Sequence, residues 1–345
     1  MARIGLLTGG GDCPGLNAVI RAAVRRGLAE GEHDFVGFLG GWAGVLENNA
    51  IELTRERTAG ILPRGGTILG TSRANPYADG NDGTASVRRT LQARGVDALI
   101  PIGGDDTLGV ALQLHRDGVP VVGVPKTIDN DLGGTDVTFG FQTAVQIVTD
   151  AIDRLHTTAE SHNRVMVVEV MGRHAGWIAA QAGIAGGADA ILVPERTFDI
   201  EQVVAHLRHR HERGVTFSII VVAEGAAPRE GTLTTLEGAA TDAFGHARLG
   251  GIGVTLEKEI ERRTGFQTRV TILGHVQRGG TPVAFDRVLG TRFGVAAMDA
   301  VAASRFGTMV GLRGTEIVEI TLADALREPK LLDPRLYETA ELFFG

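Results

Sequence analysis

Cysteine and long apolar runs are nearly absent from this sequence. Cys13 is the single cysteine among 345 residues, which excludes an intrachain disulfide and a thiolate metal cage. No run of about 18 apolar residues is present, so the sequence predicts no transmembrane helix. Residues 1–7 lack the pattern of a signal peptide, and we therefore expect a cytoplasmic protein.

An excess of positive charge is also lacking. The formal net charge is -7, which argues against nucleic acid or an anionic membrane as the main partner. A local cluster of arginines could still bind an anionic substrate. The chain has no low-complexity stretch, short-period repeat or obvious linker, and its length suits two moderate domains.

Glycine, in contrast, is abundant, with 49 residues. The glycines cluster where apolar runs end, which indicates backbone packed close to a ligand rather than flexible linkers. Short runs rich in Val and Ile alternate with helical patterns, as is typical of parallel strands buried on both faces, so an α/β fold is predicted. Strands are expected at residues 4–8, 97–102, 121–124, 165–170, 191–193, 217–223 and 269–273.

The division into domains is predicted from the same pattern. A boundary is expected near Phe139, and the chain is expected to return to the first domain around Gly251. Residues 226–250 are the least regular stretch, and we expect a loop or hairpin there.

A glycine-rich turn follows the expected strand at residues 4–8, and a second glycine-rich stretch lies at residues 66–73. In an open parallel sheet, ligands bind beyond the carboxyl ends of the strands. Residues 9–12 (GGGD) stand between a strand and a helix, where backbone amides suit a phosphate, although a tight turn without a ligand is the alternative. Pro14 breaks the dinucleotide fingerprint, and the P-loop pattern is absent. Residues 66–73 repeat the theme with Arg73, which could bind phosphate in a bidentate way or be a solvated surface charge.

Two adjacent carboxylates, Asp105 and Asp106, follow the expected strand at residues 97–102. Such a pair is repulsive unless a cation or a basic side chain neutralises it. Mg²⁺ prefers one or two carboxylates together with phosphate oxygens and waters, so a magnesium–phosphate site is one interpretation. An aspartate that caps the following helix is the other.

Residues 125–131 (PKTIDND) place a cation, a hydroxyl group and two carboxylates directly after another expected strand. Turn formation accounts for Asn130 and Asp131, because Asn and Asp favour turns. It does not account for Lys126 together with Asp129.

With these motifs the chain resembles the phosphofructokinases, and within them the pyrophosphate-dependent, actinobacterial-type branch. The resemblance runs in family order from residue 6 to residue 282, through LLTGGGDCPGLNAVIR, GGTILGTSR, IGGDDT, PKTIDND, ESHNRVMVVEVMGRHAGWIAA and LGHVQRGGTP. It implies two Rossmann-like domains with mostly parallel central sheets and an active site in the cleft between them. The donor domain is then expected at residues 1–138 plus about 251–305, and the sugar-phosphate domain at 139–250 plus about 306–345.

The resemblance also implies roles for residues on the donor side. Asp129 matches the catalytic base that accepts the proton of the sugar 1-hydroxyl, and Asp105 matches the position that holds Mg²⁺, with Asp131 as a second acid near the metal. The expected donor-binding residues are Gly10, Gly11, Arg73, Gly104, Asp106 and Lys126. Thr127 matches a residue that touches the transferring group. Amides, a metal ion, Lys and Arg suit phosphoryl transfer, which needs mostly positioning and charge neutralisation.

The sugar site is implied mainly by the second half of the sequence. The expected substrate-binding residues are Thr127, Ile128, Asp129, Met171, Gly172, Arg173, Glu224, His275, Val276, Gln277 and Arg278. Among them, Arg173 is also expected to neutralise transition-state charge, Glu224 to accept from sugar hydroxyls, and Arg278 to grip the 6-phosphate with His275. Arg164 and Arg269 match arginines that reach this phosphate from a neighbouring subunit, so a homodimer or homotetramer is expected. For each arginine a solvated surface charge is the alternative.

The expected donor depends on Asp106. Family members that use ATP usually carry Gly after the metal-binding acid, whereas pyrophosphate-dependent members usually carry Asp there and Lys at the position of Lys126. A carboxylate at that position would repel the α-phosphate of ATP. Two unit charges about 4 Å apart repel by about 4 kcal/mol at an effective dielectric near 20, or roughly a thousandfold in affinity. Pyrophosphate is therefore the expected donor, with an ATP-dependent phosphofructokinase as the alternative.

Other substrates and other classes of protein remain to be considered. Sedoheptulose 7-phosphate stays open as another acceptor. A dinucleotide-dependent oxidoreductase would suit the doubly wound pattern, but the fingerprint is broken and no acidic ribose partner can be placed. A catalytically silent sugar-phosphate sensor would be expected to lack Asp129 or the metal-binding carboxylate, and this sequence has both.

Overall fold

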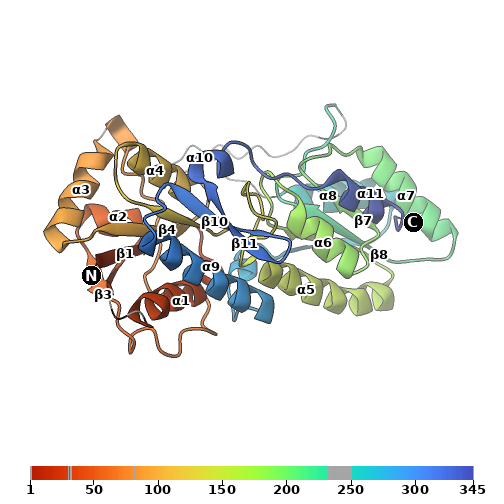
Figure 1. The fold of residues 1–345 in the computed structure, drawn as a ribbon. Helices are drawn as coiled ribbons and strands as arrows, with labels where there is room; N and C mark the ends of the chain where they lie inside the picture. Colours follow the sequence, from red (N-terminus) through yellow and green to blue (C-terminus); the bar gives the residue numbers. More distant parts are fainter. Residues whose placement is uncertain are drawn as a thin grey trace.

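Two sheets of mostly parallel strands organise the chain, and each has helices on both faces (Figure 1). The computed structural model describes residues 2–29, 31, 33–80, 82–231, 233 and 251–344. The N-terminal strand belongs to one half and the C-terminal helix to the other. In these described ranges, no helix is both long enough and apolar enough to span a membrane.

The first half is built on a seven-stranded sheet with the order β11-β10-β5-β4-β1-β2-β3. Its strands are β1 (Ala2–Thr8), β2 (His33–Phe38), β3 (Ala50–Glu52), β4 (Ala98–Gly103), β5 (Val122–Pro125), β10 (Thr308–Arg313) and β11 (Glu316–Thr321). The five central strands are parallel, and β3 and β11 run antiparallel at the two edges. The chain winds outward in opposite directions from β1 and β4, so a crevice is expected between their carboxyl ends.

Alternate residues of β1 pack against helices on opposite faces of this sheet. Leu6 lies in the core with Phe293, on the face covered by α1 (Leu16–Ala29) and α9 (Ala284–Ala302), which lie side by side in Figure 1. Leu7 lies in the core with Leu108 on the other face. The helices there are α2 (Trp42–Leu46), α3 (Gly83–Arg94), α4 (Asp105–Arg116) and the short α10 (Leu322–Ala325), with the 3₁₀ turn η1 (Ala78–Gly80) nearby in the chain. Burial on both faces explains why these strands read as continuous apolar runs.

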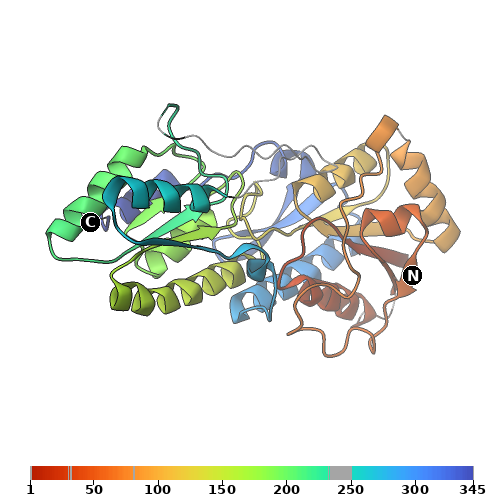
Figure 2. The same ribbon diagram turned by 180° about the vertical axis from the view of Figure 1, so that it is seen from behind.

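The second half is built on a four-stranded parallel sheet with the order β7-β8-β6-β9. Its strands are β6 (Val165–Val170), β7 (Ala190–Leu192), β8 (Ser218–Ala223) and β9 (Thr268–Ile272). The helices α5 (Phe141–His162) and α6 (Trp177–Ala185) cover one face, and α7 (Ile200–Glu212) and α8 (Ile252–Thr264) cover the other, which Figure 2 brings to the front. The 3₁₀ turn η2 (Gly274–Arg278) follows β9, and α11 (Pro334–Glu341) packs on α6.

Local sequence explains several helix ends. The Asp82 carboxylate accepts a hydrogen bond from the Ala85 N–H at 2.9 Å and so caps α3, which ends at Gly95 in the left-handed conformation. The long helix α5 also ends on a left-handed residue, Asn163. These start and stop residues fix the lengths of the helices between the strands.

The mostly parallel α/β architecture is as predicted, but the strands of the last third are distributed differently from the expected division. Of residues 251–305, which are expected in the first half, α9 does lie there against α1, but α8 and β9 belong to the second half, because β9 pairs with β6. Of residues 306–345, which are expected in the second half, α11 does lie there against α6, but β10 pairs with β5 in the first half. Which sheet a strand joins depends on such long-range pairing, which local sequence does not encode. Of the expected loop at 226–250, residues 232 and 234–250 lie outside the described part of the chain.

Candidate active site

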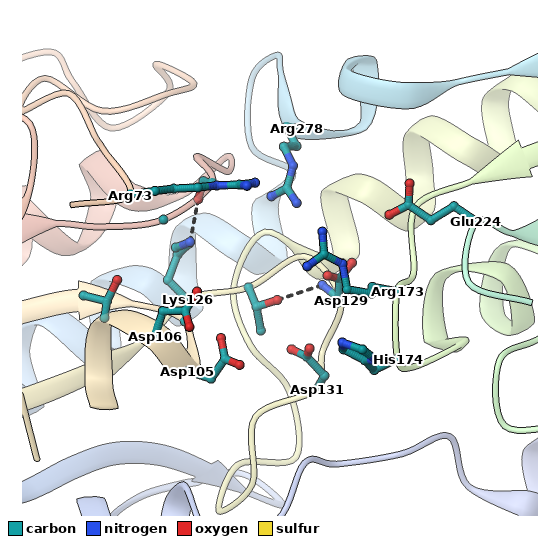
Figure 3. Close-up of a pocket in the computed structure, with 15 residues that line it drawn as sticks. Arg73, Asp105, Asp106, Lys126, Asp129, Asp131, Arg173, His174, Glu224 and Arg278 are labelled. Atoms are coloured by element: carbon teal, nitrogen blue, oxygen red, sulfur yellow. Dashed lines mark hydrogen bonds between the residues drawn. The ribbon is translucent and has the colours of Figure 1, made fainter. Parts of the chain in front are cut away.

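A cleft lies between the two halves, where the carboxyl ends of β1 and β4 face those of β6 and β8. Figure 3 shows acidic and basic side chains from both halves that point into it. Its lining residues are Gly10, Gly11, Arg73, Gly104, Asp105, Asp106, Thr107, Lys126, Thr127, Asp129, Asp131, Arg173, His174, Glu224 and Arg278.

The glycine turn after β1 brings backbone close to charged side chains. Gly10 has a φ of 75°, and its N–H donates to the Ser72 carbonyl at 3.1 Å. A Cβ on Gly11 would lie 2.6 Å from a guanidinium nitrogen of Arg278. A side chain at either position would strain the turn or displace the arginine, so the tight approach itself requires glycine here.

Lys126 connects this turn to the acidic side of the cleft. Its side chain is buried, and Nζ donates to the Gly11 carbonyl oxygen (Figure 3). Burial lowers the pKa of Lys126, and the negative charges of Asp129 and Asp105 act in the opposite direction. Burial of the ammonium group therefore costs solvation free energy, and its acidic neighbours favour the charged form.

Asp129 lies in the loop after β5. Its N–H donates to the Thr127 hydroxyl at 3.0 Å, and its Oδ1 is buried without a hydrogen-bond partner in the described part of the chain. Burial raises the pKa of Asp129, while the positive charges of Arg278 and Lys126 oppose that shift. An unpartnered buried carboxylate oxygen is costly, which indicates that it takes its partner from a ligand.

A second group of carboxylates stands beside Asp129. Asp105 and Asp106 lie in the first turn of α4, whose N-cap is Gly104, so neither aspartate is the N-cap residue. The pKa of Asp131 is raised to about 6 by burial and by the negative charges of Asp129 and Asp105. Oxygen ligands that repel one another in this way fit a hard cation such as Mg²⁺. No group of three or more His, Cys, Asp or Glu residues among the described ones forms a ready-made cage, so other ligands would have to complete the coordination.

The second half contributes two turns that interlock. Arg173 and His174 follow β6, and Glu224 follows β8. The Glu224 N–H donates to the carbonyl of Val170 at 2.8 Å, and a Cβ on Gly225 would lie 2.0 Å from the Arg173 carbonyl oxygen. Burial raises the pKa of Glu224, and Arg173 opposes the shift. A carboxylate and a guanidinium group are thus presented together to the cleft.

Other residues expected at the sugar site do not line the cleft. Ile128 and Gln277 are fully buried, and Gln277 accepts from the Met171 N–H at 3.2 Å, so this side chain connects η2 to the end of β6. Gly172 is buried with a φ of 139°. His275 and Val276, which are also expected at the sugar site, are both exposed, Val276 to 59%. Of the expected GHVQR residues, only Arg278 reaches the cleft.

Arg164 and Arg269 also lie away from the cleft of their own chain. Arg164 immediately precedes β6, whereas Arg173 follows it, and six strand residues separate the two ends by about 20 Å. The Arg164 side chain donates to Gln267 at 2.9 Å. Arg269 lies 3.6 Å from the Glu261 carboxylate with 45% of its side chain exposed. Neither arginine can serve the cleft of its own chain from these positions.

Two lining residues were not among the expected site residues. His174 follows Arg173 and is drawn next to Asp131 in Figure 3. Thr107 lies in α4, and a Cβ on Gly9 would lie 2.4 Å from its hydroxyl oxygen. His174 falls inside the VMGRHAGW segment, so the sequence contained that signal. Nothing in the sequence marks Thr107 as a site residue except its position directly after Asp106.

Transfer of a phosphoryl group needs positioning and charge neutralisation more than covalent chemistry, and the cleft offers backbone amides, cations and carboxylates for a metal ion. Fold and site together therefore indicate a phosphotransferase. Residues 3–301 match the family model described as phosphofructokinase. The chain belongs to the phosphofructokinase family.

Similar proteins differ in the donor that their names state. The chain is 60% identical over 343 residues to a pyrophosphate–fructose 6-phosphate 1-phosphotransferase from Amycolatopsis methanolica, which covers 99% of this chain and 100% of that protein. It is 54% identical over 344 residues to an ATP-dependent 6-phosphofructokinase from Mycobacterium bovis, with the same coverage. Among solved structures, phosphofructokinase from Pichia pastoris in the T-state matches with a TM-score of 0.84 and 30% identity, over 99% of this chain and 36% of that longer chain.

Proposed function

We propose that this protein transfers a phosphoryl group from inorganic pyrophosphate to the 1-hydroxyl of fructose 6-phosphate, giving fructose 1,6-bisphosphate and phosphate. The orphaned, buried Oδ1 of Asp129 supports the reaction, because a general base needs a free oxygen where the hydroxyl proton leaves. As the sugar oxygen bonds to the terminal phosphorus, its proton passes to Asp129 and the bridging oxygen leaves with the departing phosphate. Lys126 and Arg278 flank this carboxylate and would neutralise the charge on the phosphates.

Mg²⁺ is the proposed metal ion. Asp105, with Asp131 beside it, would hold the ion together with donor oxygens and waters, in keeping with the raised pKa of Asp131. When bound, the ion neutralises charge on the donor.

The observation that carries the donor assignment is the place of Asp106. A second hollow adjoins the cleft, lined by Asn75, Tyr77, Gly109, Val110, Leu112 and Leu326, and both Asp105 and Asp106 line it as well. Asp105 and Asp106 therefore stand between the cleft and an adjoining space beside α4 that could take a longer donor. The negative charge of Asp106 opposes an additional phosphate there, whereas pyrophosphate stays on the near side. The name of the relative from Amycolatopsis methanolica supports the same donor.

ATP is the second candidate donor, because a relative that is 54% identical is named as ATP-dependent. The test measures fructose 1,6-bisphosphate formation by purified protein with Mg²⁺ and either pyrophosphate or ATP. We expect kcat/KM to be at least a hundredfold higher with pyrophosphate, and chelation of Mg²⁺ to abolish turnover. A preference for ATP would contradict the donor assignment, and no product with either donor would contradict the enzyme function.

The sugar phosphate is proposed to lie between Arg173, Glu224 and Arg278. Because Arg164 and Arg269 lie far from the cleft of their own chain, we propose that they complete the 6-phosphate site of a neighbouring subunit in a homodimer or homotetramer. A cytoplasmic location is part of the same proposal.

A further inference from the structure

The loop that carries Asp129 is held from outside by a segment near the C-terminus. This segment leaves α10 in the first half and reaches α11 in the second, so it passes from one half to the other (Figure 1). Lys330 lies in the middle of it. A Cβ on Gly133 would lie 2.9 Å from the Glu328 carbonyl oxygen, which shows how closely the loop and the segment approach.

The ammonium group of Lys330 is saturated by oxygen atoms of this loop. Nζ donates to the Asn130 side-chain oxygen at 2.8 Å, to the Thr135 carbonyl at 2.9 Å and to the Asp136 carbonyl at 2.8 Å. A lysine has three diverging donors, and all three are used. The planar fork of arginine could not reach the same three oxygens. Lys330 is also one of only three lysines among the 34 basic residues of the sequence.

The backbone of Lys330 is fixed at both of its polar groups. Its N–H donates to the Asp131 carbonyl at 2.7 Å, and its carbonyl accepts from the Trp177 indole at 3.1 Å. The ammonium group lies 5.5 Å from the centre of the Trp177 ring. Two residues further on, the Leu332 N–H donates to Glu195 at 2.8 Å. The segment therefore connects the loop firmly to the second half.

Asn130 transmits this contact to the reacting groups. It stands between Asp129 and Asp131 with a φ of 54°, and this left-handed conformation decides how the two carboxylates are presented. Its side-chain oxygen accepts from the Thr138 N–H at 3.1 Å and from Lys330. Loss of the ammonium group would leave three loop oxygens without this donor and release the turn.

We propose that Lys330 is a positioning residue for phosphoryl transfer, which holds Asp129 and Asp131 in their reactive arrangement through Asn130. The proposal rests on the proposed function of the cleft. Lys330 is not among the residues that line the cleft, so its removal should act on the geometry of the base and not through a lost substrate contact. A small displacement of a catalytic group can cost about a hundredfold in rate.

The test compares Lys330→Met with Lys258→Met, which removes an exposed lysine of α8. For Lys330→Met we expect kcat to fall by about 10- to 100-fold while the KM for each substrate stays within about threefold, since the mutation spares ground-state binding. Lys330→Arg should restore part of kcat, because it keeps the charge without the three-oxygen geometry. Lys258→Met should match the wild type.

A double-mutant cycle separates positioning from general stability. Asn130→Gly keeps the left-handed backbone but removes the oxygen that Lys330 binds, so the kcat penalty of Lys330→Met should be clearly smaller in that background. The positioning role would be overturned if Lys330→Met lowered Tm but kept kcat within twofold of the wild type. It would also be overturned if Lys330→Met lowered kcat equally in the wild-type and Asn130→Gly backgrounds. If Lys330→Met does not fold, Lys330→Gln in the same cycle decides the question.

The same measurements distinguish this inference from the proposed function. Because Lys330 acts on the loop and not on the donor, its kcat penalty should be the same with whichever donor the wild type uses. An inactive wild type would refute the proposed function. An active wild type with an unaffected Lys330→Met would refute only the role of Lys330.

Discussion

Asp129 is surrounded by charges of both signs, and the balance between them suits a base. Burial and the nearby Glu224 raise its pKa, whereas Arg278, Lys126 and Arg173 lower it. Burial favours the protonated acid, which cannot accept a proton, whereas the nearby cations favour the carboxylate and weaken it as a proton acceptor.

Asp129→Asn should lower kcat by at least about a hundredfold, the usual scale for loss of a general base, because the amide oxygen cannot take up the hydroxyl proton. Binding of fructose 6-phosphate should persist, and calorimetry of sugar binding checks this. Asp153→Asn, on the exposed side of α5, is the matched control. Turnover near the wild-type value would remove Asp129 from the mechanism.

Asp106→Gly tests the donor assignment at a single side chain. Removal of the carboxylate relieves a repulsion of about 4 kcal/mol, so kcat/KM with ATP should rise by roughly a hundred- to a thousandfold. Use of pyrophosphate should fall, since the donor side of the cleft, which Lys126 also lines, would lose one of its negative charges. The effect of a further Lys126→Gly change should not be additive, because both residues face one ligand. An unchanged ratio of the two kcat/KM values would leave Asp106 without a role in donor choice.

Residues in dense local motifs could be predicted from the sequence, whereas residues whose role depends on distant contacts could not. Asp129, Asp105 and Arg278 lie in short polar segments after strands, and the cleft contains all three. Lys330 lies in an ordinary polar stretch, and its contact with Asn130 joins positions 200 residues apart. Nothing near residue 330 in the sequence indicates that contact.

At the scale of elements, the turn after β6 and the turn after β8 form one unit. The Gly225 N–H donates to the Gly172 carbonyl at 3.1 Å, and the two backbones are so close that position 225 has no room for a Cβ. This contact sets how far Arg173 stands from Glu224.

Gly225→Ala should therefore force the two turns apart and raise the KM for fructose 6-phosphate by about tenfold or more, with a smaller change in the KM for the donor. Gly214→Ala is a control, because Gly214 has a φ of 87° and no atom within 4 Å of an added Cβ, so it costs stability far from the cleft. Steady-state kinetics with each substrate varied in turn makes the comparison. Equal effects of the two variants on KM would show that only general strain matters.

All four strands of the smaller sheet and three of the larger one could be predicted from their apolar runs, whereas the other four strands of the larger sheet could not. The expected runs at residues 4–8 and 165–170 correspond to β1 and β6. β2, β3, β10 and β11 were not expected. β11 (EIVEIT) is interrupted by glutamates and has no continuous apolar run, and β3 has only three residues. Such strands depend on a neighbour more than on their own composition.

At the scale of the whole molecule, the cleft of one chain contains only part of the expected phosphate-binding arginines. Arg278 is present, whereas Arg164 and Arg269 lie near the far ends of β6 and β9. In the proposed homo-oligomer, these two arginines would lie at the cleft of a neighbouring subunit.

Arg164→Ala should raise the KM for fructose 6-phosphate at least tenfold and change kcat much less, because a charge-assisted phosphate contact is shared by the ground and transition states. Arg89→Ala, on the exposed side of α3, should leave both constants unchanged. Mixed oligomers of Arg164→Ala and Asp129→Asn subunits should regain part of the activity, since some clefts then receive both intact residues. After subunit exchange has been demonstrated, failure to regain activity would contradict a shared site.

The antiparallel hairpin of β10 and β11 also has a consequence for synthesis of the chain. β5 pairs with β4 on one side and with β10 on the other. About 180 residues separate β5 from β10, so the ribosome makes β10 much later. At about 5–20 residues per second, the ribosome needs roughly 10 to 40 s to make that stretch. For this time the nascent sheet has an open apolar edge, of the kind that recruits other strands. A messenger RNA truncated before codon 308 would therefore yield a product without β10 that tends to aggregate. The second half, from α5 to β9, could already have folded in that product.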